Sequence, residues 1–141
     1  MRIEATVHQI QLKKEDQKVL TRLGRELGAK ESPKIKAYLE AGHGSEFKPE
    51  TWRFYSRVCL AEFDNIKPDQ NSIGKALEDI YAVGNGYPRN PDLKFYRSQN
   101  ATSISVGNII IIGEDAYRVD GCGFSRVDLP RVDARESTHA H

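Results

Sequence analysis

Residues 109–127, IIIIGEDAYRVDGCGFSRV, decide the fold of this chain. Together with residues 105–108 they predict three short strands, at 105–112, 116–119 and 123–127. Gly113 and Gly121 lie in the short polar segments between these strands, where tight turns are expected. Connections this short cannot contain a crossover helix, so the sequence predicts an antiparallel sheet.

Upstream of this stretch, strand and helix patterns follow one another irregularly. Alternating apolar and polar residues predict strands at 3–10 and 57–63. Apolar residues at helical spacing predict helices at 14–27, 33–42 and 72–83, with a short helix after Pro49. The expected fold is a single α+β domain over residues 1–130, with a mostly antiparallel sheet of about five short strands and three to four helices. A flexible C-terminal tail is expected at 131–141.

Particular residues predict where the helices begin and end. Gly28 is expected to stop the first helix, and the segment 84–86, Gly-Asn-Gly, the last one. Ser32 and Ser72 are expected to cap the N-termini of the helices that follow them. After the last helix, residues 85–103 are expected to form a long loop that is regular only near 93–96, and long loops in small domains are often functional.

The composition of the chain limits its location and its partners. With 21 basic and 20 acidic residues the net charge is +1, so nucleic acid would have to bind through a local patch. The longest apolar run, 109–112, is too short to span a bilayer, and Glu4 interrupts the apolar segment that a signal peptide needs. These features predict a cytoplasmic protein. In that compartment Cys59 and Cys122 are expected to be buried thiols.

No constellation of residues predicts catalysis, a metal site or a cofactor. The adjacent carboxylate pairs of the chain lack the orientation that a metal site requires. His43 is the candidate base, with Ser45 or Glu46 nearby, but three neighbouring loop residues do not make a catalytic geometry. We therefore expect a protein that is not an enzyme and uses no cofactor.

Basic and aromatic residues are interleaved around the long loop and the last strands. Such mixtures are common hot spots of protein interfaces, and they can also stack on bases and contact phosphates. The predicted partner contacts are Tyr87, Arg89, Lys94, Tyr96, Arg97 and Arg118. In the alternative function, a nucleic-acid-binding module, the contacts are Arg89, Lys94, Arg97, Arg118 and Arg126, converging near one end of the sheet. The residues expected in the core are Leu77, Ile80, Phe95, Ile109, Ile111 and Phe124.

Residues 77–124 resemble a pattern found in small, uncharacterised proteins of bacteriophages and conjugative elements. Residues 103–110, SISVGNII, are similar to the S-x-S-V-G-D-x-I strand of those proteins, and Tyr117 and the Gly123-Phe124 pair match the tyrosine-containing strand and the terminal G-F that follow. Upstream, residues 77–85, LEDIYAVGN, resemble the preceding L-E-x-x-F-x-x-G-N helix. Asn108 stands where an aspartate is usual.

The resemblance implies a mobile-element protein that acts inside a bacterial cell. Small phage proteins of this kind often bind a host machine, such as RNA polymerase or a defence complex of the CRISPR type, and redirect or inhibit it. The expected partner is therefore a host protein or nucleoprotein complex, with direct contact to nucleic acid as the alternative.

Overall fold

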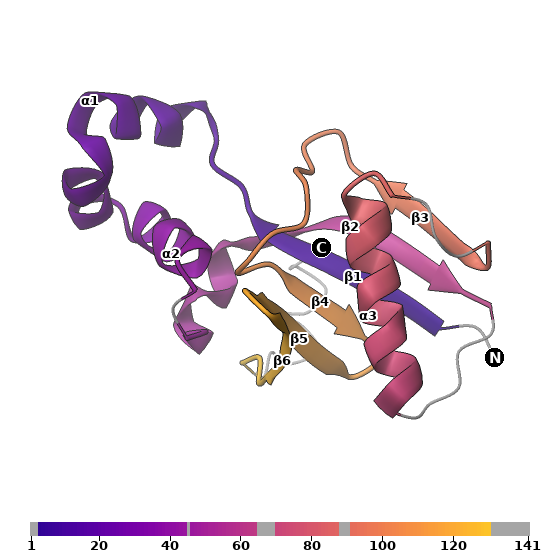
Figure 1. Ribbon diagram of the computed structural model, residues 1–141. Coiled ribbons are helices and arrows are strands. Elements are labelled where there is room, and N and C mark those ends of the chain that lie inside the picture. The colour runs from indigo at the N-terminus through magenta and orange to yellow at the C-terminus, as the bar shows by residue number, and fades with distance from the viewer. Residues whose placement is uncertain (1–2, 45, 65–69, 88–90, 131–141) are drawn as a thin grey trace, which may run out of the picture.

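A computed structural model describes residues 3–44, 46–64, 70–87 and 91–130 of the chain (Figure 1). In chain order the elements are β1 (Ile3–Ile10), α1 (Lys14–Glu31), α2 (Pro33–Gly42), the 3-10 helix η1 (Pro49–Phe54), β2 (Tyr55–Phe63), α3 (Gln70–Gly84), β3 (Leu93–Arg97), β4 (Ile109–Ile112), β5 (Asp115–Asp120) and β6 (Gly123–Val127). No helix in these ranges is long and apolar enough to cross a membrane.

The six strands form one sheet in the order β3-β2-β1-β4-β5-β6, and every neighbouring pair is antiparallel. The predicted α+β fold with an antiparallel sheet is therefore confirmed. Five strands were predicted, and β3 is the sixth. It lies in the long loop, near residues 93–96, the part of that loop for which regular structure was predicted. β4 begins at Ile109 and not at Ser105, because the Asn108 N–H bonds back to the Ser105 carbonyl in a turn.

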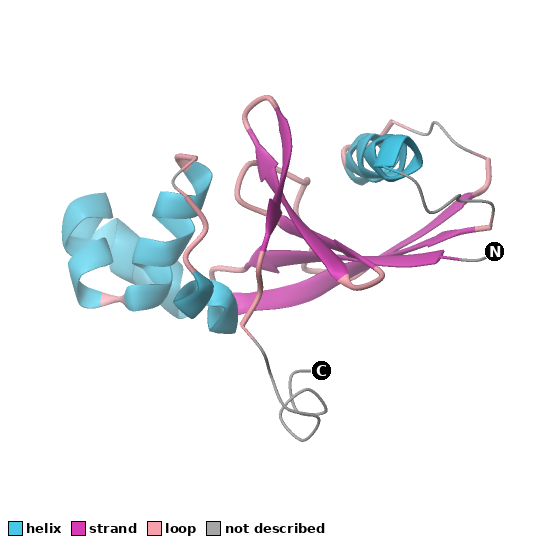
Figure 2. Cartoon of the chain, turned by 90° about the horizontal axis from the view of Figure 1, so that it is seen from below, coloured by secondary structure: helices cyan, strands magenta, loops and turns pink. Residues whose placement is uncertain are grey.

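The main core lies between α3 and one face of the sheet (Figure 2). Leu77 and Ile80 of α3 are almost completely buried in one cluster with strand residues such as Val7 and Ile110. Phe95 and Phe124 are partly buried against this cluster, as predicted. Ile109 is also buried, but Ile111, which projects from the same sheet face as Ile109, is only half-buried.

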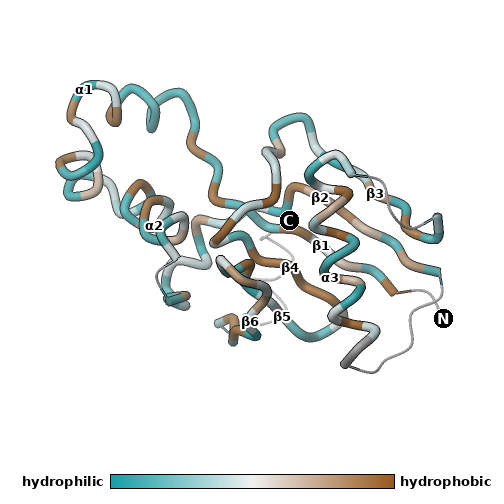
Figure 3. The backbone as a smooth tube through the Cα atoms, viewed as in Figure 1, coloured by the Kyte–Doolittle hydropathy of each residue, from teal (hydrophilic) through white to brown (hydrophobic). Residues whose placement is uncertain are grey.

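The helices α1, α2 and η1 form a second group, the helical lobe (residues 13–54), at one end of the sheet (Figures 1 and 2). As predicted, Ser32 caps α2, since its hydroxyl accepts a hydrogen bond from the Ile35 N–H. Ile35 then packs beside Gly28 of α1. Hydrophobic residues concentrate in the central strands, whereas much of α1 is hydrophilic (Figure 3).

The prediction that Gly28 ends the first helix is wrong. α1 continues to Glu31, and its backbone is interrupted at Gly24, which has a φ of 78°. Gly28 is buried, with Leu20 and Ile35 at ordinary van der Waals distance from the position that a Cβ would occupy, so this glycine lies in the packed interior of the lobe and does not end the helix. The interruption at Gly24 rotates the following residues, and Leu27, expected on the apolar face, is 54% exposed.

Two further predictions need correction. Ser72 does not cap α3, because the helix already begins at Gln70 and Ser72 lies within its first turn. Cys59 is buried as expected, but Cys122 is exposed, since it occupies the tight turn between β5 and β6. The predicted tail at 131–141 lies outside the described residues.

Candidate interaction surfaces

Several of the predicted partner contacts lie together at the β3 edge of the sheet. Tyr87 follows the C-terminus of α3, which packs beside β3, and it is 67% exposed. Tyr96 of β3 is 53% exposed, and Lys94 and Arg97 of the same strand are also exposed. We call Tyr87, Lys94, Tyr96 and Arg97 the β3 edge surface. Arg89, the remaining predicted contact of this loop, lies outside the described residues.

Arg97 combines exposure with an internal role. Its guanidinium donates a hydrogen bond to the Gly84 carbonyl at the C-terminus of α3, and it lies 5.9 Å from the centre of the Phe95 ring. A cation is favourable there because the C-terminus of a helix carries partial negative charge. Arg97 therefore connects β3 to α3. Tyr96, on the opposite sheet face, has no such restraint and is the more accessible contact.

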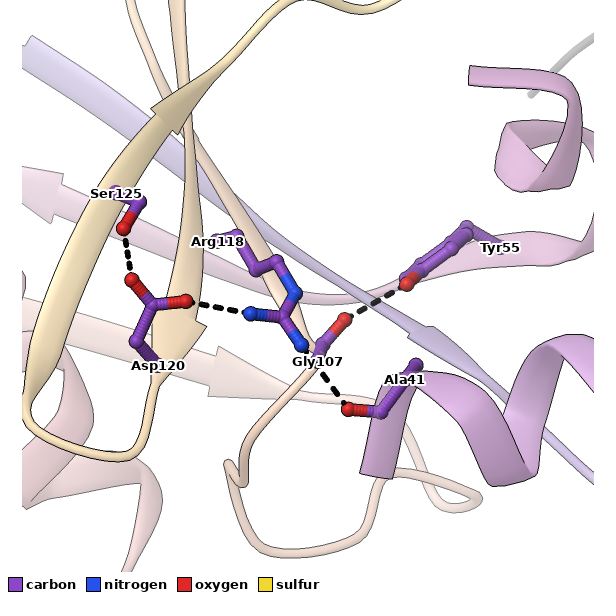
Figure 4. Close-up of polar contacts among 6 residues, drawn as sticks. All are labelled: Ala41, Tyr55, Gly107, Arg118, Asp120 and Ser125. Carbon is purple, nitrogen blue, oxygen red and sulfur yellow. Dashed lines mark hydrogen bonds and ion pairs between the residues drawn. The ribbon is translucent and has the colours of Figure 1, made fainter. Parts of the chain in front are cut away.

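Arg118 is not a surface residue, contrary to its predicted role as a partner contact. It is 6% exposed, and its guanidinium donates hydrogen bonds to the Asp120 carboxylate at 2.5 Å and to the Ala41 carbonyl at 3.2 Å (Figure 4). Ser125 donates a further hydrogen bond to the same carboxylate. Ala41 belongs to α2, so Arg118 connects the helical lobe to the sheet.

A second polar contact joins the lobe and the sheet beside Arg118. The Tyr55 hydroxyl donates a 2.7 Å hydrogen bond to the Gly107 carbonyl (Figure 4). Burial raises the pKa of Tyr55 to about 12, although the Arg118 charge acts in the opposite direction. Gly107 itself has a φ of 92°, and a Cβ at this position would lie 2.6 Å from the Ala41 carbonyl oxygen. Only glycine allows α2 to approach the turn this closely.

The serine-glycine motif in the resemblance has a structural role here. Asn108 accepts hydrogen bonds at its side-chain oxygen from the Ser105 N–H at 3.0 Å and from the Gln9 amide at 3.1 Å. Gln9 is buried and also bonds Thr102 through its amide and its carbonyl. The Asn108 oxygen acts only as an acceptor in these contacts, so an aspartate could supply the same acceptor. The motif thus fixes the 98–108 loop against β1.

His43 lies at a cavity of about 210 Å³ between α2, Tyr55 and the Ser105–Asn108 turn. The side chain is exposed, and within the described ranges no carboxylate forms a hydrogen bond or ion pair with it. Glu46 is exposed as well, and Ser45 lies outside those ranges. The catalytic arrangement considered for His43 requires such a carboxylate, and the described residues do not supply it.

Four of the five cationic residues of the nucleic-acid alternative lie in the described ranges, and these four do not converge. Lys94 and Arg97 belong to β3, whereas Arg118 and Arg126 belong to β5 and β6 at the other edge of the sheet. Five strand-to-strand steps separate β3 from β6, which is about 24 Å for a flat sheet. In addition, Arg126 is paired with Asp115 at 2.6 Å. The predicted convergence of these cations near one end of the sheet is therefore wrong, because the strand order places them at opposite edges.

A different set of cations comes together on the helical lobe, and the sequence-based prediction missed it. Lys14, Lys18 and Arg22 follow one another at four-residue spacing on α1, so they share one face of the helix. Lys13, Lys34 and Arg53 line an adjoining depression. The four-residue spacing of these cations can be read from the sequence. The net charge of the chain is close to zero, however, and it gives no indication of a local basic patch.

Comparison with known proteins adds no assignment. Neither a family model, nor a curated protein, nor a solved structure matches this chain.

Proposed function

We propose that this chain is a non-enzymatic binding protein that attaches to a host protein or nucleoprotein machine through the β3 edge surface. One observation carries the proposal: the edge strand β3 displays Tyr96, which is 53% exposed, together with the exposed Lys94 and Arg97, and Tyr87, which follows the neighbouring helix α3, is 67% exposed. Large aromatic and arginine side chains supply most of the energy of protein interfaces. An edge strand can also extend a partner's sheet through its backbone.

The chemistry of the surface favours a protein partner with acidic and apolar groups. Exposed tyrosines offer apolar area and a hydroxyl with little loss of conformational entropy. Lys94 and Arg97 add positive charge beside them, which would steer an acidic partner toward the edge. The resemblance to small phage and conjugative-element proteins is the reason for placing the partner in a bacterial host, with RNA polymerase and defence complexes as the first candidates. The proposed action is modulation or inhibition of that machine.

The test is affinity capture from nuclease-treated bacterial lysate with three versions of the protein. We expect wild type to retain a stoichiometric partner, and the double variant Tyr87→Ala/Tyr96→Ala to retain at least about tenfold less, since hot-spot truncations cost about 1–2 kcal/mol each. Tyr38→Ala is the matched control, because Tyr38 is 42% exposed but lies on α2. Equal retention by all three proteins, or no retained partner with wild type, would contradict the proposal.

A further inference from the structure

One face of the helical lobe is strongly cationic. A depression of about 520 Å³ along α1 is lined by Lys13, Lys14, Lys18 and Arg22, and no acidic residue lines it. A second depression, of about 490 Å³, is lined by Lys13, Lys34 and Arg53 and also contains no carboxylate. The two share Leu12 and Lys13, so they form one continuous surface. We call its six cations, Lys13, Lys14, Lys18, Arg22, Lys34 and Arg53, the basic surface.

Most of this positive charge is not neutralised within the molecule. Lys34 is paired with Asp16 at 2.8 Å, and Arg22 lies 3.6 Å from Glu31, an exposed and therefore weak pair. The side chains of the other four cations form no ion pair within the described part of the chain. Asp16 is occupied as well, since it also accepts the Lys13 N–H at 2.8 Å. Although burial acts to raise the pKa of Asp16, its hydrogen bonds to Lys34 and Lys13 lower it overall.

The arrangement of the cations fits a linear polyanion. Lys14, Lys18 and Arg22 form a row along α1, and four residues of helix rise by about 6 Å, so the row extends over about 12 Å. A compact anion would engage one of these groups, whereas a chain of phosphates can engage all three. The row leads through Lys13 into the second depression.

The second depression adds a feature that favours unpaired bases. Phe54 lines it, and the Arg53 guanidinium lies 4.6 Å from the centre of the Phe54 ring. Aromatic rings and guanidinium planes stack on nucleobases, and only in a single strand are the base faces open to them.

The rest of the molecule would direct a polyanion to this face. The helical lobe, residues 13–54, contains 10 basic and 7 acidic residues, a net charge of +3, whereas residues 55–130 contain 8 basic and 10 acidic residues, a net charge of −2. The sheet and α3 therefore repel phosphates that the lobe attracts.

We propose that the basic surface binds single-stranded nucleic acid, with phosphates along Lys14, Lys18 and Arg22 and a base against Phe54. This is a second binding activity. It lies on the helical lobe, whereas the β3 edge surface lies on the sheet, and it does not depend on the protein partner proposed above.

The test is fluorescence anisotropy of labelled single-stranded DNA and RNA, about 20 nucleotides long, titrated with the purified full chain. We expect affinity to fall by about 10²-fold between about 50 and 200 mM salt, as neutralisation of about four phosphates predicts. Lys14→Glu/Lys18→Glu should weaken binding at least about tenfold and flatten the salt dependence. Phe54→Leu should weaken binding a few-fold and leave the salt dependence unchanged.

The matched control is Lys30→Glu/Lys36→Glu, which changes the net charge of the same lobe equally at two exposed lysines outside both depressions. We expect it to reduce affinity by less than about threefold. The proposal is overturned if both double variants lose affinity equally, if a duplex or anionic phosphatidylserine vesicles bind more tightly than the single strand, or if wild type does not bind at low salt.

Failure of this inference is distinguishable from failure of the β3 proposal. Tyr87→Ala/Tyr96→Ala should bind oligonucleotides like wild type, because neither tyrosine lines the basic surface. Lys14→Glu/Lys18→Glu should in turn capture the protein partner normally from nuclease-treated lysate. Circular dichroism of each variant checks that it is folded.

Discussion

The sheet with α3 and the helical lobe are built on different balances of apolar and charged residues. The sheet and α3 share a continuous core in which residues such as Ile80 and Ile110 are fully buried. In the described part of the lobe the buried apolar side chains are those of Ile35 and Ala37. The lobe has a net positive charge and the sheet region a net negative one. Stability and charge are therefore concentrated in different halves of the molecule, and a few contacts around Arg118 and Tyr55 connect them.

The largest effect is expected from matched core truncations in the two regions. Ile110→Ala should lower the free energy of unfolding by about 4 kcal/mol, because the surrounding sheet and helix cannot collapse into the cavity. Ile35 is as fully buried, but its surroundings in the lobe are less constrained, so Ile35→Ala should cost about 2 kcal/mol. Urea unfolding followed by circular dichroism measures both. Equal losses would mean that the lobe is packed as rigidly as the sheet.

The next effect concerns the close approach of α2 to the sheet at Gly107. Gly107→Ala should destabilise the protein by about 3 kcal/mol, because the new Cβ combines a positive φ with a collision against the Ala41 carbonyl. Gly113→Ala is the control, since Gly113 has a φ of 60° but no atom near its Cβ position. It should cost about 1 kcal/mol. If the two variants unfold at the same denaturant concentration, the contact between the lobe and the turn is not rigid.

Two arginines of neighbouring strands test the value of the polar junction. Arg118→Met should cost about 2 kcal/mol, because it removes a buried charge that bonds both Asp120 and the Ala41 carbonyl. Arg126→Met removes an exposed ion pair with Asp115 and should change stability by less than about 0.5 kcal/mol. Amide hydrogen exchange should show faster opening of α2 in the first variant only. Unchanged protection of α2 would show that Arg118 does not hold the lobe.

The smallest effect is a pH dependence that also reports on this junction. Tyr55 has a pKa of about 12 in the folded protein, above its ordinary value of 10.0, so the folded state favours the neutral phenol. The associated stability is present below pH 10 and is lost as the pH rises from 10 to 12.

Tyr55→Phe isolates this contribution. The variant should lose about 1 kcal/mol at neutral pH with its hydrogen bond to Gly107, and it should lose less stability than wild type between pH 10 and 12. Thermal unfolding across this range measures both. Parallel pH profiles would mean that Tyr55 is solvated and does not secure the turn.

Local patterns in the sequence were sufficient to predict most elements of the fold. Alternation identified β1 and β2, and the short turns after residues 112 and 120 required antiparallel pairing. The cap at Ser32 and the stop at Gly84 were also read correctly. These features depend on residues within a few positions of one another, and the same backbone geometry follows wherever such residues occur.

What the sequence did not reveal depends on contacts between distant segments. In the sequence Gly28 is typical of a residue that ends a helix, but in the structure α1 continues past it and Ile35 of α2 packs beside it. Arg118 has the character of a surface hot spot, but the arrival of α2 buries it against a carbonyl 77 residues away in the chain.

By itself the sequence determined most of the secondary structure, the antiparallel sheet and the total charge of the chain. Only the tertiary structure decided which arginines are buried, that β3 forms an exposed edge, and that the cations of α1, Lys34 and Arg53 lie on one face. Local propensity fixes the conformation of each element, whereas burial and surface charge are set by which elements pack together. That packing depends on residues far apart in the chain, so no short stretch of sequence contains it.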